Sequence, residues 1–242
     1  MSILNTILII LLYNSLFKKS NNTLYCGLFG FSGSENKISN TDKITLLAFY
    51  NQERGKDSLG YYTLENGVCK DVGKPENQII NDKFSFPESK LFIGHTRAAS
   101  VGIVNKSNAH PFEYGSIILA MNGTLSNHWQ LCTDNKFNIC DFDVDSQVLA
   151  AIINKTKSKD ILSKIKGGCA IMYTNTKTGK LYCFRNSERP LYHGFIDGCM
   201  YISSIENSLK LIKCVDVKEF KENYLYEILD GVILNKYNVP VP

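Results

Sequence analysis

The chain has 242 residues, 44% hydrophobic and 21% charged, a composition typical of a globular protein that can bury a sizeable core. Its formal net charge is only +4 and no basic stripe is present, which argues against nucleic-acid binding. None of the eight cysteines forms a C-x-x-C pair, so neither a zinc site nor a disulfide framework is predicted. A glycine-rich phosphate loop is also absent, and we expect no metal and no cofactor.

The first 25 residues differ from the rest of the chain. Residues 3–17 are nearly all apolar, and Lys18 and Lys19 follow them. A membrane-spanning helix needs about 20 apolar residues, and a secretory signal carries its positive charge before the apolar run. We therefore interpret residues 1–25 as a pro-segment and residues 26–242 as the folded domain. A membrane anchor remains the alternative, and it would associate the protein with a membrane only if residues 1–25 are retained.

The rest of the pattern predicts more strands than helices. Two hairpins are indicated by the turns Glu65-Asn66-Gly67 and Thr178-Gly179. A helix is expected after Thr41-Asp42, which would cap it, and another is expected to span residues 145–155, where apolar residues share one face. In chain order, strands are predicted at residues 26–31, 61–64, 68–72, 91–94, 116–121, 169–174, 181–185, 191–195 and 200–203. Hairpin-spaced strands favour antiparallel sheets covered by helices, an α+β layered domain.

Five short segments border these strands and are dense in glycine or polar residues. They are C-G-L-F-G at 26–30, R-G-K-D-S-L-G at 54–60, G-H-T-R-A-A-S at 94–100, N-A-H-P at 108–111 and M-N-G at 121–123. Loops at the ends of rigid strands are common places for functional residues. A single buried cysteine is usually a core residue, so Cys26 gains interest only because the other four segments accompany it.

Together these segments resemble the class II glutamine amidotransferases, and most closely the glutaminase domain of glutamine–fructose-6-phosphate amidotransferase. That domain carries similar motifs in the same order, and the resemblance covers Cys26 to about Leu211. It implies the four-layer αββα sandwich of N-terminal nucleophile hydrolases, with antiparallel sheets. It also implies an enzyme that hydrolyses the side-chain amide of L-glutamine to glutamate and ammonia, without a cofactor.

The resemblance implies a catalytic role for three residues. Cys26 would be the nucleophile, and its own α-amino group, which titrates near about 7.7–8.0 when free, would be the general base. The Asn122 side chain and the Gly123 backbone N–H would form the oxyanion hole. Without the resemblance, Asn122-Gly123 would be interpreted as a hairpin turn. His95 and His110 are expected to be structural residues bonded to backbone.

Three more residues are implied to bind the substrate. Arg97 would hold the glutamine carboxylate, because its planar guanidinium matches a carboxylate in two parallel hydrogen bonds. Asp145 would hold the α-amino group, and Ser100 would lie near the carboxylate. The alternatives are a surface position for Arg97 and a helix N-cap for Asp145, which is compatible with substrate binding.

The sequence also departs from the family pattern. Ala98 stands where an aromatic residue is frequent and Met121 where a histidine is frequent. More important, residues 1–25 precede Cys26, whose α-amine must be free in the expected mechanism. The chain length leaves no room for an acceptor domain, so we expect a cytoplasmic, free-standing glutaminase or a subunit that supplies ammonia to a separate acceptor synthase. An inactive or membrane-tethered module and an amidase for another amide are the alternatives.

Overall fold

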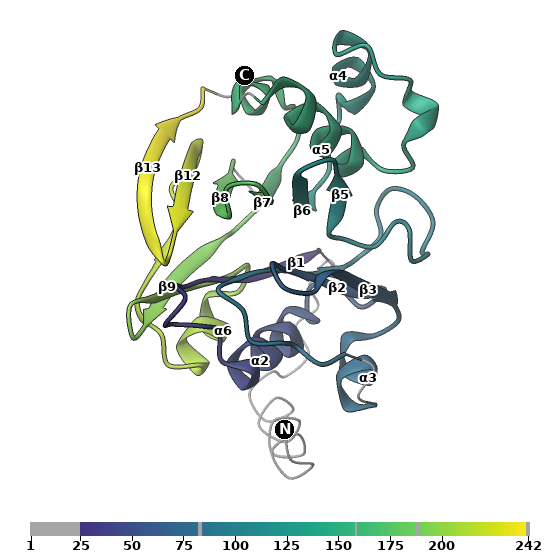
Figure 1. The fold of residues 1–242 in the computed structure, drawn as a ribbon. Coiled ribbons are helices and arrows are strands. Elements are labelled where there is room, and N and C mark those ends of the chain that lie inside the picture. Colours follow the sequence, from purple (N-terminus) through teal and green to yellow (C-terminus); the bar gives the residue numbers. More distant parts are fainter. Residues whose placement is uncertain (1–24, 82–83, 158, 187–188, 241–242) are drawn as a thin grey trace.

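The computed structural model describes residues 25–81, 84–157, 159–186 and 189–240, so residues 1–24 of the predicted pro-segment lie outside the described residues. Two antiparallel sheets lie face to face between two layers of helices (Figure 1). The predicted α+β layered fold with antiparallel sheets is confirmed. Within the described residues, no helix is long and apolar enough to cross a membrane.

Sheet A has seven strands in the order β11-β9-β10-β1-β4-β2-β3. Their bounds are β11 Val215–Glu219, β9 Tyr192–Ile196, β10 Cys199–Ser203, β1 Gly27–Ser32, β4 Leu91–Arg97, β2 Ser58–Thr63 and β3 Gly67–Val72. Strand β1 therefore lies at the centre of the sheet, where it pairs with β10 on one side and β4 on the other.

Sheet B has six strands in the order β13-β12-β8-β7-β6-β5. Their bounds are β13 Val232–Asn238, β12 Tyr224–Leu229, β8 Lys180–Arg185, β7 Cys169–Asn175, β6 Ile117–Gly123 and β5 Phe112–Tyr114. Helices α2 Thr41–Asn51, α3 Pro75–Ile80 and α6 Glu206–Leu211 belong to the layer on sheet A, and α4 His128–Asp134 and α5 Asp145–Thr156 to the layer on sheet B (Figure 1). Two short 3-10 helices, η1 Ile139–Asp141 and η2 Lys159–Lys164, flank α5.

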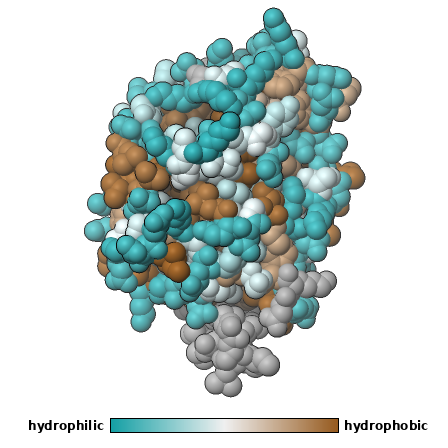
Figure 2. Space-filling view, in the orientation of Figure 1, coloured by the Kyte–Doolittle hydropathy of each residue, from teal (hydrophilic) through white to brown (hydrophobic). Residues whose placement is uncertain are grey.

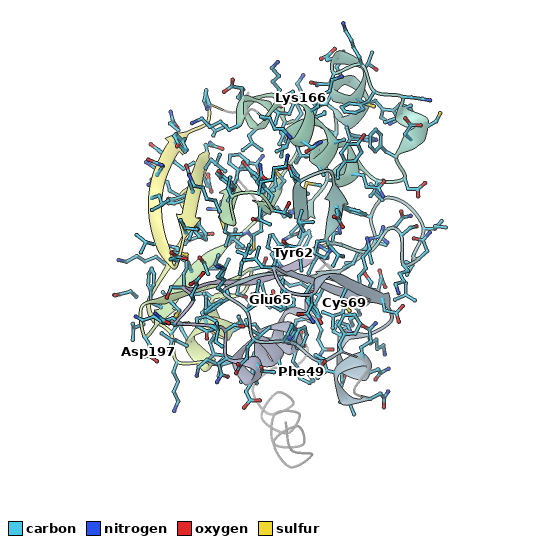
Figure 3. The ribbon with its side chains drawn as sticks, viewed as in Figure 1. Phe49, Tyr62, Glu65, Cys69, Lys166 and Asp197 are labelled. Carbon is cyan, nitrogen blue, oxygen red and sulfur yellow. The ribbon has the colours of Figure 1, made fainter. Side chains whose placement is uncertain are left out.

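Alternating side chains on the strands separate the layers. In β1, Leu28 packs in the core between the two sheets, whereas Phe29 and Phe31 pack in the core beneath the helices of sheet A. Tyr62 lies between the sheets and Phe49 lies in the helix layer (Figure 3). Because successive strand residues point to opposite faces, each strand of sheet A except β11 contributes to two cores.

The predicted elements were found close to their expected positions, with some differences at their ends. The first helix is capped by Asn40, whose side chain accepts a hydrogen bond from the Lys43 backbone N–H, and not by Thr41 or Asp42. Strand β4 extends three residues beyond the predicted Gly94 to Arg97. The hairpin-turn interpretation of Asn122-Gly123 is wrong, because both residues are in β6 and pair with Ala170 and Cys169 of β7.

Candidate active site

A small pocket lies where the ends of β1, β4 and β6 meet the start of α5. It brings together five of the six predicted site residues, and Asn122 is the one absent from its lining. The lining residues are Cys26, Arg97, Ala98, Ser100, Val101, His110, Met121, Gly123, Val144, Asp145 and Ser146. The volume is about 20 Å³, which is enough for a water molecule but not for an amino acid.

Cys26 is held at the mouth of the pocket by its backbone and its thiol. The Arg54 Nε donates a hydrogen bond to the Cys26 carbonyl oxygen at 2.9 Å. The Cys26 Sγ lies 3.4 Å from both the backbone nitrogen and the carbonyl oxygen of Ala98. Burial raises the pKa of this thiol to about 11, although the Ala98 N–H and the charge of Arg97 act in the opposite direction. In this state of the chain, the thiol is therefore protonated at neutral pH.

Two arginine side chains contact the ring of Tyr25, the residue before Cys26, and together they form the Tyr25 clamp. The guanidinium carbon of Arg189 lies 4.5 Å from the centroid of the Tyr25 ring, and that of Arg54 lies 5.5 Å from it. Cation–π contacts of this kind are worth about 0.5–1 kcal/mol at exposed sites. Sequence reasoning missed this clamp, although Arg54 belongs to one of the five segments. No sequence pattern predicts the contact between Arg189 and Tyr25, because the two residues are far apart along the chain.

Arg97 is buried, with 3% of its surface exposed, which contradicts the surface alternative. Its Nη2 donates to the Val101 carbonyl at 2.6 Å and its Nη1 to the Ile103 carbonyl at 3.1 Å. The guanidinium thus fixes the loop that follows β4. An arginine has five N–H donors, so these two bonds leave donors for a ligand.

Asp57 and Gly55 show the structural role of the R-G-K-D-S-L-G segment, which packs against the end of β4. The Asp57 carboxylate accepts a hydrogen bond from the Ala99 backbone N–H at 2.8 Å, and the Asp57 N–H donates to the Arg97 carbonyl at 2.9 Å. A Cβ at Gly55 would lie only 2.5 Å from the Thr96 carbonyl oxygen. Glycine is therefore required for this segment to pack against the end of β4, and Asp57 then fixes the loop from the other side.

Asn122 and Gly123, the last two residues of β6, combine an unpartnered buried amide with a backbone conformation that requires glycine. Asn122 is 1% exposed, and its Nδ2 has no hydrogen-bond partner among the residues that the structure describes. Gly123 has φ of +131°, and a Cβ there would lie 2.1 Å from the Gly168 carbonyl oxygen, so no other residue fits. A buried amide donor without a partner is costly, which points to a ligand that supplies the acceptor.

Asp145 is the first residue of α5 and is 5% exposed. Its Oδ2 accepts from the Leu125 N–H at 2.6 Å and its Oδ1 from the Ser146 N–H at 2.9 Å. Burial raises its pKa, because the charged form loses hydration. The N-cap position belongs to Val144, so the N-cap interpretation of Asp145 is wrong by one residue. The Ser100 hydroxyl lies 3.2 Å from the Thr124 hydroxyl, which connects the loop after β4 to the end of β6.

Two buried histidines lie side by side at the pocket, and one of them, His110, is part of its lining. The rings of His95 and His110 are 4.1 Å apart. His95 Nε2 lies 3.0 Å from the Met121 carbonyl oxygen, as expected for a structural histidine, whereas His110 Nε2 lies 2.9 Å from the Ser146 hydroxyl and not from backbone. The pair thus supports the residues next to Asn122 and Asp145. Burial lowers the pKa of His95 to about 3 and that of His110 well below its ordinary value, so both are neutral.

These lowered pKa values predict acid sensitivity. In the unfolded chain both rings titrate near about 6.5, so below that pH the unfolded state binds protons that the folded state does not. Stability should fall as the pH falls from about 6.5 toward 5, with about 1.4 kcal/mol per pH unit from each histidine. Urea unfolding should show that the free energy of unfolding of the His95→Gln variant decreases less steeply as the pH falls over this range. An unchanged slope would mean that His95 already carries a proton in the folded protein.

The chain is similar to known glutamine-dependent enzymes. A family model described as a glutamine amidotransferase domain matches residues 95–210. The glutamine–fructose-6-phosphate aminotransferase of Thermococcus kodakarensis is 32% identical, and the match covers 87% of this chain and 39% of that protein. The amidophosphoribosyltransferase of Methanocaldococcus jannaschii is 27% identical, with 90% of this chain and 52% of the relative covered. The chain thus spans about half the length, or less, of these two relatives.

Solved structures agree on the fold. The glutamine phosphoribosylpyrophosphate amidotransferase of B. subtilis superposes with a TM-score of 0.70 at 21% identity, covering 88% of this chain and 49% of that one. A structure titled the allosteric regulatory enzyme of purine biosynthesis gives a TM-score of 0.72 at 23% identity, with 88% and 49% covered. The chain therefore belongs to the class II glutamine amidotransferases, a family of enzymes, and has the four-layer αββα fold of N-terminal nucleophile hydrolases.

Proposed function

We propose that this chain hydrolyses the side-chain amide of L-glutamine, with Cys26 as an N-terminal nucleophile. The observation that carries the proposal is the pairing of the Cys26 thiol with buried Arg97 and Asp145 in one pocket. A free amino acid has a carboxylate and an ammonium group, and each needs a partner of opposite charge. An amidase for a substrate without these groups would have no use for two buried charges, which are costly to desolvate.

The nucleophile acts once the peptide bond to Tyr25 is gone. Removal of residues 1–25 gives Cys26 a free α-amine, which accepts the thiol proton. The thiolate then attacks the amide carbon of glutamine, and the carbonyl oxygen becomes an oxyanion. The Cys26 pKa of about 11 in the uncut chain explains why the thiol needs this base. As the tetrahedral intermediate collapses, its –NH2 group takes the proton held by the α-ammonium group and leaves as ammonia. The remaining thioester is hydrolysed by water to glutamate and the free thiol.

The oxyanion is held by Asn122 and Gly123. The Asn122 Nδ2, which lacks a partner among the described residues, supplies one N–H, and the Gly123 backbone supplies another. A preorganised donor of this kind contributes about 3–4 kcal/mol to transition-state stabilisation. Its unmet hydrogen bond in the resting protein means that the interaction is made only when the oxyanion forms.

The substrate ends are held by Arg97, Asp145 and Ser100. The remaining donors of Arg97 bind the glutamine carboxylate in a planar arrangement, with the Ser100 hydroxyl beside it. Asp145 accepts hydrogen bonds from the α-ammonium group. Because the pocket has a volume of only about 20 Å³, glutamine enters when the loop after β4 moves outward. That loop is the segment whose carbonyls Val101 and Ile103 are bonded to Arg97.

The ammonia acceptor is a separate question. The two relatives are named for a fructose-6-phosphate and a phosphoribosyl reaction, and this chain covers 39% and 52% of their lengths. We propose that the domain supplies ammonia to a separate acceptor synthase in the cytoplasm. An uncut chain is an inactive module in this scheme, because the peptide bond to Tyr25 leaves Cys26 without a free α-amine.

A diazo-ketone analogue of glutamine should label one cysteine in the active protein. The expected site is Cys26, because it lies in the pocket, and excess glutamine should protect it by competing for Arg97 and Asp145. Peptide mapping by mass spectrometry locates the label. Cys69 is half-buried and provides the matched control. The Cys69→Ala variant should be labelled fully at Cys26, and the Cys26→Ala variant should not be labelled at all. Labelling spread over several cysteines, or no protection by glutamine, would refute the glutaminase assignment while leaving the fold intact.

The Asn122→Ala variant separates catalysis from binding. Loss of one oxyanion donor should lower kcat by about 100-fold or more, with a much smaller effect on KM, because the donor contacts the transition state and not the bound substrate. Steady-state ammonia release measures both constants. Asn235→Ala, on the far strand β13 of sheet B, is the matched control and should leave them unchanged. A variant whose KM rises while kcat stays constant would place Asn122 in substrate binding instead.

A further inference from the structure

A second and much larger cavity lies on the helix-facing side of sheet B. Its volume is about 410 Å³, within the range of small-molecule sites. Strands β7, β8, β12 and β13 form its floor, and the end of α5 and the start of η2 form its wall. The lining residues are Ile117, Ile153, Lys157, Lys159, Asp160, Tyr173, Asn175, Tyr182, Leu225, Glu227 and Tyr237. None of them lines the Cys26 pocket.

Aromatic rings dominate the floor. Tyr173 and Tyr182 are stacked, with centroids 4.7 Å apart and planes 10° from parallel. Tyr237 lies beneath the ammonium of Lys159, whose Nζ is 3.0 Å from the ring centroid. Ile153 and Leu225 complete an apolar surface. Rigid aromatic side chains bind flat rings well, because little conformational entropy is lost on contact.

The charges of the cavity favour an anion. The buried Glu227 carboxylate is already satisfied, because it bonds with Lys180 and accepts hydrogen bonds from the Asn235 amide at 3.2 Å and the Tyr237 hydroxyl at 2.9 Å. It is therefore a structural group and not a ligand for a cation. Lys157 and Lys159 contribute two ammonium groups against the single carboxylate of Asp160 on the same wall.

The cavity also offers hydroxyl donors. Within the part of the chain that the structure describes, the Tyr173 and Tyr182 hydroxyls make no hydrogen bond to another residue. Burial raises the pKa of both phenols, so they stay protonated and can donate. Polar groups that converge on an apolar pocket usually fix the orientation of a ligand.

We propose that this cavity binds a small anionic compound that carries a flat ring, with the ring against the tyrosines and the anionic group beside Lys157 and Lys159. The proposal is independent of the glutaminase assignment. It gives the domain a second ligand site on the opposite face of sheet B from its interface with sheet A. The helix α5, which starts at Asp145 and ends at the cavity, connects the two sites.

The test uses naphthalene sulfonate as the probe, measured by calorimetry on the full chain. One equivalent should bind. Sulfate alone, which lacks the ring, and naphthyl methanol, which lacks the charge, should each bind at least about tenfold more weakly. Equal binding of naphthyl methanol would overturn the proposal, because the cavity would then not recognise the anion.

Variants locate the site. Lys159→Glu should weaken binding of the sulfonate by at least about tenfold, and Tyr173→Phe by less, since it keeps the ring. Lys166→Ala, in the same connection between α5 and β7 but outside the cavity lining, is the matched control and should bind normally (Figure 3). Thermal unfolding checks that each variant folds.

One competing surface needs its own control. Val232, Ile233 and Leu234 on the edge strand β13 are 58%, 37% and 46% exposed, and hydrophobic side chains gather along that edge (Figure 2). Leu234→Ser should leave binding unchanged. Loss of binding in Leu234→Ser together with normal binding in Lys159→Glu would place the probe on the strand edge and refute the cavity as a site.

Discussion

The position of Cys26 at the start of the central strand of sheet A is the constraint on which the rest of the site depends. The backbone of β1 is paired on both edges, with Gly27 opposite Thr96 of β4 and Phe29 opposite Ser203 of β10. A Cβ at Gly27 would lie 2.5 Å from the Thr96 Oγ1, so β1 and β4 pack tightly next to the proposed nucleophile. The paired backbone of β1 holds Cys26, the residue just before the strand, in a fixed position. The hydrogen bond from Arg54 to the Cys26 carbonyl oxygen fixes it further.

The other site residues are arranged around this fixed point by structures that the fold needs anyway. Arg97 ends β4 and fixes the loop beside the thiol, and Asp145 begins α5 and fixes the segment after β6. Their burial would be unfavourable without these bonds to backbone groups, because a buried charge needs partners. In the proposed function, binding of glutamine adds partners to groups that are already positioned, and the entropy of ordering them is not lost again at that step.

The sequence predicted the layers and most of the site for a definable reason. Short, nearly continuous apolar runs mark strands buried on both faces, and the strands from β1 to β10 were predicted apart from the short β5. The last three strands were not predicted: β11 and β13 are largely exposed edge strands with weak alternation, and no hairpin-turn motif was recognised beside β12. The five motif segments predicted the residues around Cys26, because each segment borders a strand end.

What the sequence could not predict is where distant residues meet. The clamp on Tyr25 needs Arg189, and the large cavity needs Tyr173, Tyr182 and Tyr237 to share one face of sheet B. These tyrosines look like ordinary strand residues, and only the strand order β13-β12-β8-β7 brings them together. The unpartnered Asn122 amide likewise depends on the fold, because Asn122 is buried within β6 and does not lie in an exposed turn.

The measurement that tests the account most directly compares two forms of the same protein. One form is produced with Cys26 as its first residue and the other with Tyr25 still attached, and intact mass confirms each N-terminus. Ammonia release from glutamine is then measured for both. Release is expected only from the form that begins at Cys26, because only that form has a free α-amine to accept the thiol proton. Equal rates from the two forms would contradict an N-terminal nucleophile at Cys26.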